Sequence, residues 1–163
     1  MTASSYNAIV TAPGFSLGIR CTDDEITAIE FLEPQPEKAP TTPLAAEAAR
    51  QIQAYLNDPA FKFGLPLRPA GTPFQHRVWA QIAAIPSGRT DTYGQLAKML
   101  KNAPRAVGQA CGANPFPLVI PCHRVVATGG RLGGFSRHGG GFLLDVKRWL
   151  LRHEGIAPAA TPG

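Results

Sequence analysis

The chain has 163 residues, of which 44% are hydrophobic, and a formal net charge of +5. This length suits one large domain or two small ones, and it buries enough surface to fold without disulfides or a structural metal. Its three cysteines are widely spaced, with no CxxC pair, which argues against a disulfide framework and a zinc site. We expect a cytoplasmic protein, because no secretory pattern begins the chain and no segment approaches the ~20 apolar residues of a membrane span.

The first part of the chain, residues 6–34, alternates runs of β-branched and aromatic residues with breaks at Pro13-Gly14 and at residues 22–24. This pattern predicts a small meander of strands. After a proline-rich loop at 33–43, apolar residues at helical spacing predict a helix over 44–58. Residues 61–73 favour a strand that leads into a linker, so we place the boundary of an N-terminal α/β domain, residues 1–70, at Ala70 and Gly71.

The second half reads as helical. Thr72 followed three residues later by Gln75 has the spacing of a capping box and predicts a helix over 73–85. Thr92 is expected to cap a second helix over 93–100, and a short turn then leads to a third over 105–114. Two short helices joined by a tight turn indicate a helix-turn-helix.

The third of these helices is nearly bare of side chains. Ala106, Gly108, Ala110 and Gly112 alternate along it, and Arg105 is its one long cation. A phosphate backbone or a groove floor could therefore approach closely, while tight helix packing remains the alternative because the pattern is common. From Phe74 to residue 152 the only acidic residues are Asp91 and Asp145, against eleven Lys and Arg. This cationic half suggests a polyanionic partner such as nucleic acid, and a merely soluble basic protein remains an equal alternative on charge alone.

Reactive chemistry is concentrated in "IPCHRVV", residues 120–126. Pro121 keeps Ile120 out of the helical region, so Cys122 is expected to end an extended, buried segment. Neighbouring side chains on such a segment point apart, so His123 is not expected to touch the Cys122 sulfur directly. A working pair then requires a bend, an intervening water or another base; Glu154 is a candidate to orient the imidazole, and a structural cysteine remains the alternative.

Five ordered motifs between Gly71 and Gly155 favour a reactive Cys122 over a structural one. "GTPFQ..VW", "IPSGRT.TYGQLA", "RAVGQACGANP", "IPCHRVV" and "LLRHEG" resemble the O6-alkylguanine-DNA alkyltransferases, the methylated-DNA–protein-cysteine S-methyltransferases. The resemblance implies an α/β (α+β) protein. Its N-terminal sheet domain would be ribonuclease H-like, a mainly helical DNA-binding and alkyltransferase domain would span 71–157, and a disordered tail would span 158–163.

The resemblance also assigns roles to single residues. Cys122 would accept the alkyl group, His123 would take the thiol proton through a bridging water, and Glu154 would hold His123 in the right tautomer. Asn114 would tie the helix-turn-helix to the active-site segment by hydrogen bonds. Tyr93 would help to rotate the nucleotide and donate a proton to the leaving guanine.

The resemblance also implies which residues contact DNA and which form the base pocket. Arg105 would fill the gap in the base stack, and the helix with Ala106, Gly108 and Gln109 would lie in the minor groove. For Arg124, a phosphate contact and an internal salt bridge both remain open. The pocket would be formed by the Val125 carbonyl, the covering Phe135, the Ser136 amide and Lys147, although Lys147 could equally be an exposed helical lysine. Phe135 stands where the family has Tyr, and residues 136–147 are longer than the family pattern.

The function expected from these features is direct-reversal repair of DNA. The alkyl group on O6 of guanine, and on O4 of thymine as an extension, would pass irreversibly to Cys122 after base flipping. The partner would be double-stranded DNA carrying O6-alkylguanine, with no cofactor, no metal and no membrane, and the protein would act as a monomer. The alternatives are a damage-binding relative without repair activity, a Cys-His hydrolase or acyltransferase, and a methylation-responsive transcription factor.

Overall fold

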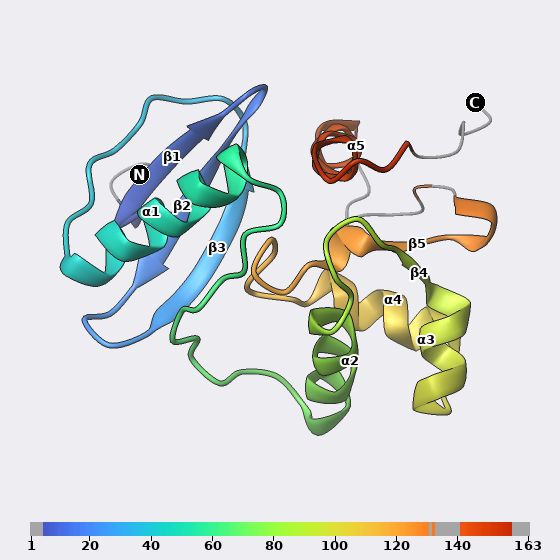
Figure 1. The fold of residues 1–163 in the computed structure, drawn as a ribbon. Coiled ribbons are helices and arrows are strands. Elements are labelled where there is room, and N and C mark those ends of the chain that lie inside the picture. The colour runs from blue at the N-terminus through green and yellow to red at the C-terminus, as the bar shows by residue number, and fades with distance from the viewer. Residues whose placement is uncertain (1–4, 131, 133–140, 158–163) are drawn as a thin grey trace. The chain divides into compact units, whose positions relative to one another are not determined.

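A computed structural model describes residues 5–130, 132 and 141–157 of the chain. The chain divides into two compact units, residues 1–70 and residues 71–163 (Figure 1). The first unit contains a small antiparallel sheet with a helix, and the second is mainly helical. The predicted mixed α and β fold class is confirmed.

The first unit is built on a three-stranded meander. Strands β1 (Ala8–Ala12), β2 (Phe15–Cys21) and β3 (Ile26–Leu32) pair antiparallel in the order β1-β2-β3. The turn between β1 and β2 occurs at Pro13-Gly14, as predicted, and Gly14 has a φ of 87°, a conformation that favours glycine. The meander expected from the alternation of residues is therefore present.

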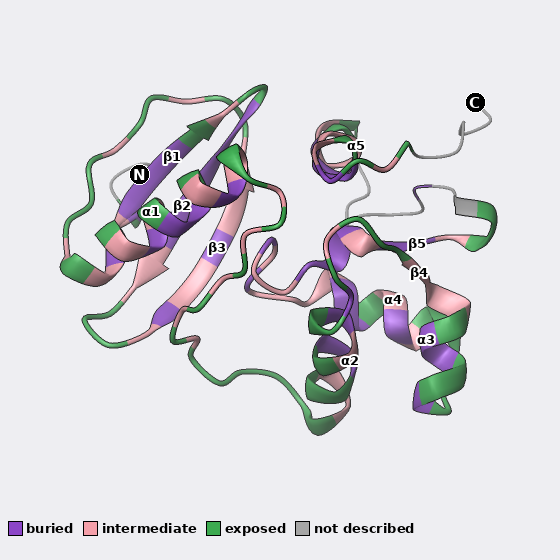
Figure 2. Cartoon of the chain, in the orientation of Figure 1, coloured by how far each residue is buried: buried purple, intermediate pink, exposed green. Residues whose placement is uncertain are grey.

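Helix α1 (Pro43–Asn57) covers the sheet of this unit, with its buried stripe turned inward (Figure 2). Thr42 caps the helix, since its hydroxyl accepts a hydrogen bond from the Ala45 amide at 3.1 Å. The buried Gln51 side chain bonds both backbone groups of Gly64, at 2.8 and 3.1 Å. Part of the backbone hydrogen bonding of residues 61–67 is therefore made by a side chain. The prediction of a strand there is wrong, apart from a single bridge between Ile26 and Leu67.

The second unit contains helices α2 (Pro73–Ala83), α3 (Tyr93–Leu100), α4 (Pro104–Gly112) and α5 (Gly141–His153). The capping box predicted at Thr72 and Gln75 is present at the start of α2. Thr92 caps α3 as predicted, and it also forms a capping box, with Gln95. Lys101, with a φ of 53°, ends α3 in the left-handed conformation and starts the turn to α4. Helices α3 and α4 are the expected helix-turn-helix pair.

Helix α2 braces this pair from one side. The buried Trp79 indole donates a hydrogen bond to the Ala110 carbonyl of α4 at 2.9 Å, and Arg77 donates to the Leu100 carbonyl at the end of α3 at 3.1 Å. Trp79 is in the core of this unit. Trp149 on α5 is half-buried and stacks on His153 with ring centroids 4.8 Å apart.

A two-residue parallel ladder brings distant parts of the second unit together. Strand β4 (Asp91–Thr92) pairs with β5 (Val125–Val126), with Asp91 opposite Val125. Strand β4 runs directly into α3, and β5 directly follows the 3-10 turn η2 (Cys122–Arg124) and precedes a second turn, η3 (Thr128–Gly130). The ladder therefore sets the start of α3, at Tyr93, beside the segment that carries Cys122.

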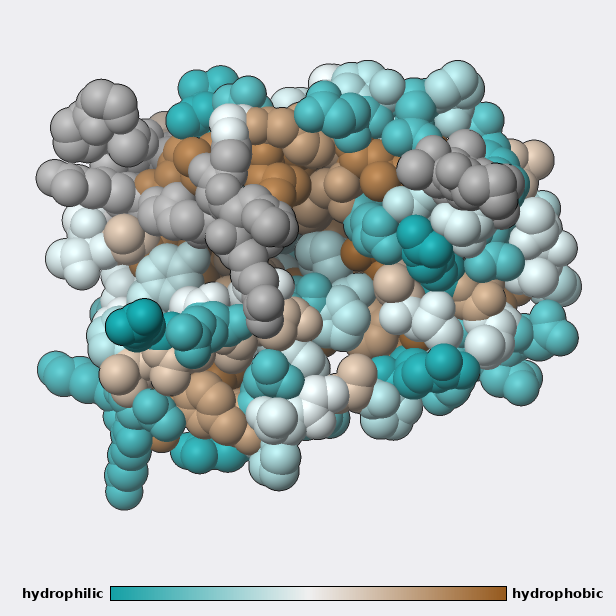
Figure 3. Space-filling model, turned by 180° about the vertical axis from the view of Figure 1, so that it is seen from behind, coloured by the Kyte–Doolittle hydropathy of each residue, from teal (hydrophilic) through white to brown (hydrophobic). Residues whose placement is uncertain are grey.

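The surface is mixed in character. Figure 3 shows hydrophilic side chains interspersed with patches of apolar ones on the face that it presents. Among the described residues, Met99 on α3 is an exposed large hydrophobic side chain, with 58% of its surface accessible. None of the helices in the described part of the chain is long and apolar enough to cross a membrane.

Candidate active site and DNA-facing groove

Cys122 is the first residue of the short 3-10 turn η2, and only 2% of its surface is exposed. Its amide donates to the Ile120 carbonyl at 2.8 Å, while Pro121 has φ −81° and ψ 68°, the conformation of an inverse γ-turn. The buried Leu118, with a φ of 78°, bends the same segment further upstream. The extended segment predicted up to Cys122 is thus replaced by a sharp bend at the sulfur.

Asn114 holds this bend from the end of α4. Its amide nitrogen donates to the Ile120 carbonyl at 2.9 Å and to the Cys122 sulfur at 3.2 Å, and its amide oxygen accepts from the Phe116 amide at 2.9 Å. The hydrogen bonds that the resemblance implies for Asn114 are present in the structure. One side chain therefore fixes the position of the sulfur relative to the helix-turn-helix.

His123 and Glu154 form a fully buried pair. His123 Nε2 lies 2.8 Å from Glu154 Oε2, and neither side chain is exposed. A carboxylate can only accept, so Nε2 carries the proton and Nδ1 is left as an acceptor. Nδ1 is buried and bonds to nothing within the described ranges. Burial lowers the pKa of His123, against the opposing effect of Glu154, so the imidazole is neutral near pH 7.

Arg124 turns into the domain and completes the charge balance around Glu154. Its guanidinium donates to Glu154 Oε1 at 2.8 Å and Oε2 at 3.0 Å, and to the Ile85 carbonyl at 2.7 Å. Only 11% of its side chain is exposed. The assignment of Arg124 to DNA binding is therefore corrected: of the two alternatives left open by the sequence, the internal salt bridge is the one present.

Lys147 on α5 is completely buried, so its interpretation as an exposed helical lysine is wrong. Its ammonium donates to the Val125 carbonyl at 2.8 Å and lies 5.8 Å from the centroid of the Tyr93 ring. Burial lowers the pKa of Lys147 to about 8, although the thiols of Cys111 and Cys122 favour its charged form. The Lys147 ammonium therefore exerts a positive potential on the thiols of Cys111 and Cys122.

Tyr93 lies at the start of α3, against the same cluster. Burial, and then the nearby Cys111 and Cys122 thiols, raise the pKa of its phenol well above the usual value. The hydroxyl therefore keeps its proton near neutral pH and is available as a donor. Tyr93, Cys122, His123 and Lys147 come from three separate segments, and the fold brings them together as expected.

One member of the cluster was not predicted from the sequence. Cys111 on α4 is buried, and it lies close enough to Cys122 for each thiol to influence the pKa of the other. The signal that could have found it is its spacing. Cys111 precedes Asn114 by three residues, and positions three apart on a helix share a face.

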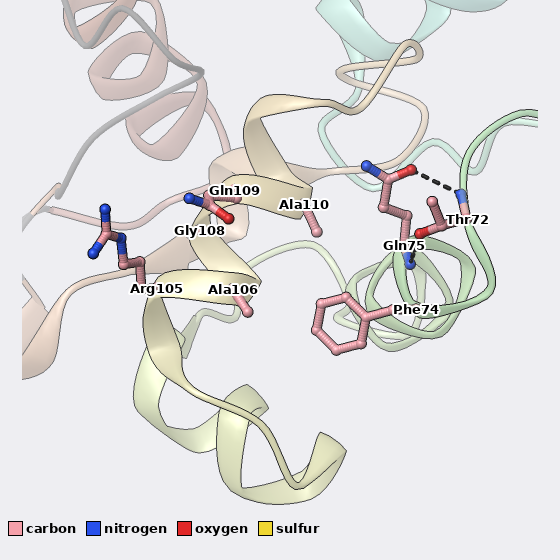
Figure 4. A pocket seen from close by; sticks show the side chains of 8 residues that line it. All are labelled: Thr72, Phe74, Gln75, Arg105, Ala106, Gly108, Gln109 and Ala110. Carbon is pink, nitrogen blue, oxygen red and sulfur yellow. Dashed lines mark hydrogen bonds between the residues drawn. The ribbon is translucent and has the colours of Figure 1, made fainter.

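A groove of about 740 Å³ runs between the start of α2 and the exposed side of α4 (Figure 4). It is lined by Thr72, Phe74, Gln75, Arg105, Ala106, Gly108, Gln109 and Ala110. Arg105 and Gln109 are exposed, and a Cβ built on Gly108 would meet no atom within 4 Å. Phe74 on α2 is half-buried and turns its ring toward α4 in Figure 4. The bare helix thus faces a concave, open surface.

Two predicted pocket residues, Phe135 and Ser136, lie outside the described residues. Val125 is buried, and its carbonyl accepts the hydrogen bond from Lys147. No group of three or more metal-ligating side chains occurs in the part of the chain that the structure covers.

Comparison with known proteins shows which family the chain resembles. Residues 73–156 match the profile described as "6-O-methylguanine DNA methyltransferase, DNA binding domain". The chain is 43% identical over 111 residues to the methylated-DNA–protein-cysteine methyltransferase of Methanosarcina acetivorans, covering 67% of this chain and 68% of the relative. It is 39% identical over 118 residues to the constitutive methyltransferase of Bacillus subtilis, covering 71% and 69%.

Solved structures agree. The Mycobacterium tuberculosis protein described as OGT in complex with DNA superimposes with a TM-score of 0.76 at 33% identity, covering 93% of this chain and 94% of that one. The O6-methylguanine-DNA methyltransferase of Pyrococcus kodakaraensis gives a TM-score of 0.60 at 25% identity, covering 93% and 99%. The chain belongs to the 6-O-methylguanine DNA methyltransferase family.

Proposed function

We propose that this protein repairs O6-alkylguanine in DNA by moving the alkyl group to Cys122, once per molecule. The observation that carries the proposal is the buried Cys122 sulfur, held by Asn114 at 3.2 Å next to a neutral His123 that is fixed by Glu154. Relatives across both comparisons carry names for the same activity. The arrangement supplies a nucleophile, a base and an orienting group in one buried site.

The chemistry follows from the protonation states. His123 Nδ1 takes the Cys122 proton through a bridging water, since direct contact between adjacent side chains is not needed. The thiolate attacks the alkyl carbon, so an S–C bond forms, the C–O6 bond breaks and its electron pair goes to guanine. Tyr93, protonated because burial raises its pKa, donates to the leaving base. The thioether product has no evident route back to the thiol, so each molecule reacts once.

The helix-turn-helix would deliver the base. Helix α4 lies in the minor groove in this proposal, because Ala106 and Gly108 leave room for the sugar-phosphate walls and Gln109 is exposed. Arg105 would fill the gap in the stack when guanine rotates out, at a cost of a few kcal/mol for unstacking. A related structure contains DNA, which supports this partner. Phosphate contacts would make binding weaken steeply with salt.

Further parts of the proposal rest on the resemblance. Residues 71–157 would form the alkyltransferase domain, Phe135, Ser136 and the Val125 carbonyl would line the base pocket, and O4-alkylthymine would be a second substrate. The three cysteines are free thiols, which is consistent with a reducing cytoplasm. Size-exclusion chromatography tests the expected monomer.

The test is intact-protein mass after incubation with an excess of duplex containing one O6-methylguanine. We expect each molecule to gain one methyl group, mapped to the peptide with Cys122, and the DNA to return to unmodified guanine. Cys122→Ser should accept none, while Cys21→Ser, changed in the other unit, should behave as the wild type. Transfer to another residue, or several methyl groups repaired per molecule, would overturn the proposal.

A further inference from the structure

The buried groups around His123 are balanced in charge. The Glu154 carboxylate accepts hydrogen bonds from the Arg124 guanidinium at 2.8 Å through Oε1 and at 3.0 Å through Oε2, and Oε2 also lies 2.8 Å from His123 Nε2. The imidazole and the carboxylate are both 0% exposed, and the Arg124 side chain is 11% exposed. One anion and one cation thus share this interior with a neutral ring. The proposed transfer mechanism assigns no step to the cation.

The His123–Glu154 pair can act as a base only while it holds a single proton. With one proton, the ionised carboxylate can only accept, so Nε2 donates to it and Nδ1 keeps a lone pair. A second proton removes that lone pair wherever it binds. On the imidazole it occupies Nδ1 directly; on the carboxyl it makes the carboxyl a donor to Nε2, and the ring proton then lies on Nδ1. The number of protons on the pair therefore decides whether Nδ1 is an acceptor.

The positive charge of Arg124 controls that number. A guanidinium stays protonated in proteins, so its charge is fixed. Besides Glu154, the Arg124 guanidinium donates to the Ile85 carbonyl beyond α2 at 2.7 Å, which holds the cation beside the carboxylate from a second side. Without this cation, the buried pair would carry an uncompensated negative charge, which is unfavourable in the interior. Uptake of a proton by the pair would remove that charge.

The other titratable groups near His123 do not replace Arg124. Burial lowers the pKa of His123 most, against the effect of its carboxylate partner, and Arg124 and then Lys147 lower it further. The Lys147 ammonium on α5 is bound to a backbone carbonyl and has a pKa of about 8. The Cys122 thiol on η2 and the Tyr93 phenol on α3 are uncharged near pH 7, because the neighbouring thiol and burial raise the pKa of the first and burial raises that of the second. Arg124 is therefore the cation in direct contact with the pair.

We propose that Arg124 is a positioning residue for the base: its fixed charge beside Glu154 limits the His123–Glu154 pair to one proton, which keeps Nδ1 able to accept the Cys122 proton. The inference rests on the proposed function of Cys122. Arg124 itself neither gives nor takes a proton. When the Cys122 proton reaches Nδ1 through water, a negative charge appears on the sulfur, so the total charge of the buried groups does not change.

The experiment uses full-length protein with ¹⁵N-labelled histidine, and the His123 signals are assigned by their loss in His123→Gln. Nuclear magnetic resonance then gives the protonation state of each ring nitrogen as a function of pH, without DNA. In the wild type we expect a proton on Nε2 and none on Nδ1 at pH 7. In Arg124→Met, which removes the charge, the pKa of His123 should rise by at least about one unit. Arg124→Lys, which keeps a charge, should stay near the wild type.

A double variant separates charge from packing. Arg124→Met combined with Glu154→Gln removes both charges, so the pKa of His123 should return below its usual 6.5 although both contacts are lost. The pH profile of single-turnover methyl transfer is recorded for the wild type, Arg124→Met and Arg124→Lys. The acid limb of Arg124→Met should move to higher pH by the same amount as the His123 titration, and that of Arg124→Lys should not move. Thermal unfolding checks that each variant is folded.

A purely structural arginine would lower the unfolding temperature without moving the His123 titration. An unchanged or lowered His123 pKa in Arg124→Met overturns the inference, as does a double variant shifted as far as the single one. A proton on Nδ1 of the wild type at pH 7 overturns it without any variant. The titration needs no DNA, so the expected His123 shift in a protein that transfers no methyl group would contradict the proposed function while supporting the role of Arg124.

Discussion

Glu154 Oε2 lies 2.8 Å from His123 Nε2, and Oε1 of the same carboxylate lies 2.8 Å from Arg124 Nε. One buried acid therefore orients the proposed base, and the Arg124 guanidinium neutralises its charge. The carboxylate itself is positioned by the end of α5, where Gly155 adopts a φ of 83° and the Ile156 amide returns to the Leu151 carbonyl at 2.8 Å. The last residues of the domain therefore control groups that lie about thirty positions earlier in the sequence.

Replacing Glu154 by glutamine should impair both stability and reaction. Removing one member of a buried ion pair leaves Arg124 without its counter-charge and His123 without a fixed tautomer, which costs about 3 kcal/mol of unfolding free energy. Urea unfolding and single-turnover methyl transfer measure the two effects. Asp145→Asn, which breaks the exposed pair with Arg148, is the control and should change the unfolding free energy by less than about 1 kcal/mol. Equal behaviour of the two variants would contradict the buried role.

The pH dependence of methyl transfer should reflect the neutral state of His123. Burial lowers the pKa of this imidazole below its usual 6.5, so it remains a base until the pH falls through that lowered value. Under saturating DNA, the single-turnover rate should therefore start to decline only below pH 6.5. An acid limb centred at or above that pH would show that the controlling base is another group.

Substitutions of Arg124 and Arg105 should have different effects, because Arg124 has a structural role and Arg105 is proposed to bind DNA. Arg124→Gln removes internal bonds to Glu154 and Ile85, so it should lower the unfolding free energy and leave the salt dependence of DNA affinity unchanged. Arg105→Gln changes an exposed side chain, so its stability should match the wild type and its DNA affinity should fall. Fluorescence anisotropy over a range of salt concentrations, combined with urea unfolding, makes this distinction. If the DNA affinity of Arg124→Gln depended less on salt than that of the wild type, this would support a phosphate contact by Arg124.

Lys147→Met should stabilise the protein near neutral pH. The pKa of Lys147 is about 8 in the folded state and higher in the unfolded chain, so the unfolded chain binds more protons between these values. The unfolding free energy of the wild type therefore rises with pH over this interval. We expect Lys147→Met to be about 2 kcal/mol more stable at pH 7 and to lose this rise. Lys98→Met, at an exposed position on α3, is the control.

Gly108→Leu should affect stability and DNA binding in opposite directions. The position is helical and its Cβ would meet nothing within 4 Å, so exchange of glycine for leucine should stabilise α4 by about 1 kcal/mol. The same side chain would project into the groove between α2 and α4, so DNA affinity should fall at least tenfold. Parallel thermal unfolding and anisotropy measurements test this pair of effects. Unchanged affinity would place the DNA contact elsewhere.

Features determined by neighbouring residues were predictable from the sequence. The capping boxes at Thr72 and Thr92 fixed where α2 and α3 begin, because the interacting groups are three positions apart. The family motifs added Cys122, His123 and Glu154, which spacing alone left uncertain. The structure then brought His123 and Glu154 within hydrogen-bond distance.

Features determined by distant contacts were not predictable. Arg124 was left between two roles because its partner lies thirty residues away, and the burial of Lys147 depends on how α5 packs against β5. Residues 61–67 were misjudged because the Gln51 side chain, on a helix, takes hydrogen bonds that a neighbouring strand would otherwise make. The place of Cys111 near Cys122 was not predictable either, because nothing in the local sequence distinguishes a packed thiol from one beside a nucleophile.

The burial of Lys147 has a consequence for the spent protein. Before reaction, the Cys122 thiol can still ionise, and the Lys147 ammonium favours the ionised form, although Cys111 and burial raise the pKa of this thiol; the thioether formed by alkylation cannot ionise at all. The alkylated molecule then retains a buried cation that Cys122 can no longer offset, and its Asn114 amide faces a poorer acceptor. Resistance to unfolding should thus report whether a given molecule has already been used, which would let a cell distinguish spent copies from fresh ones by their fold alone.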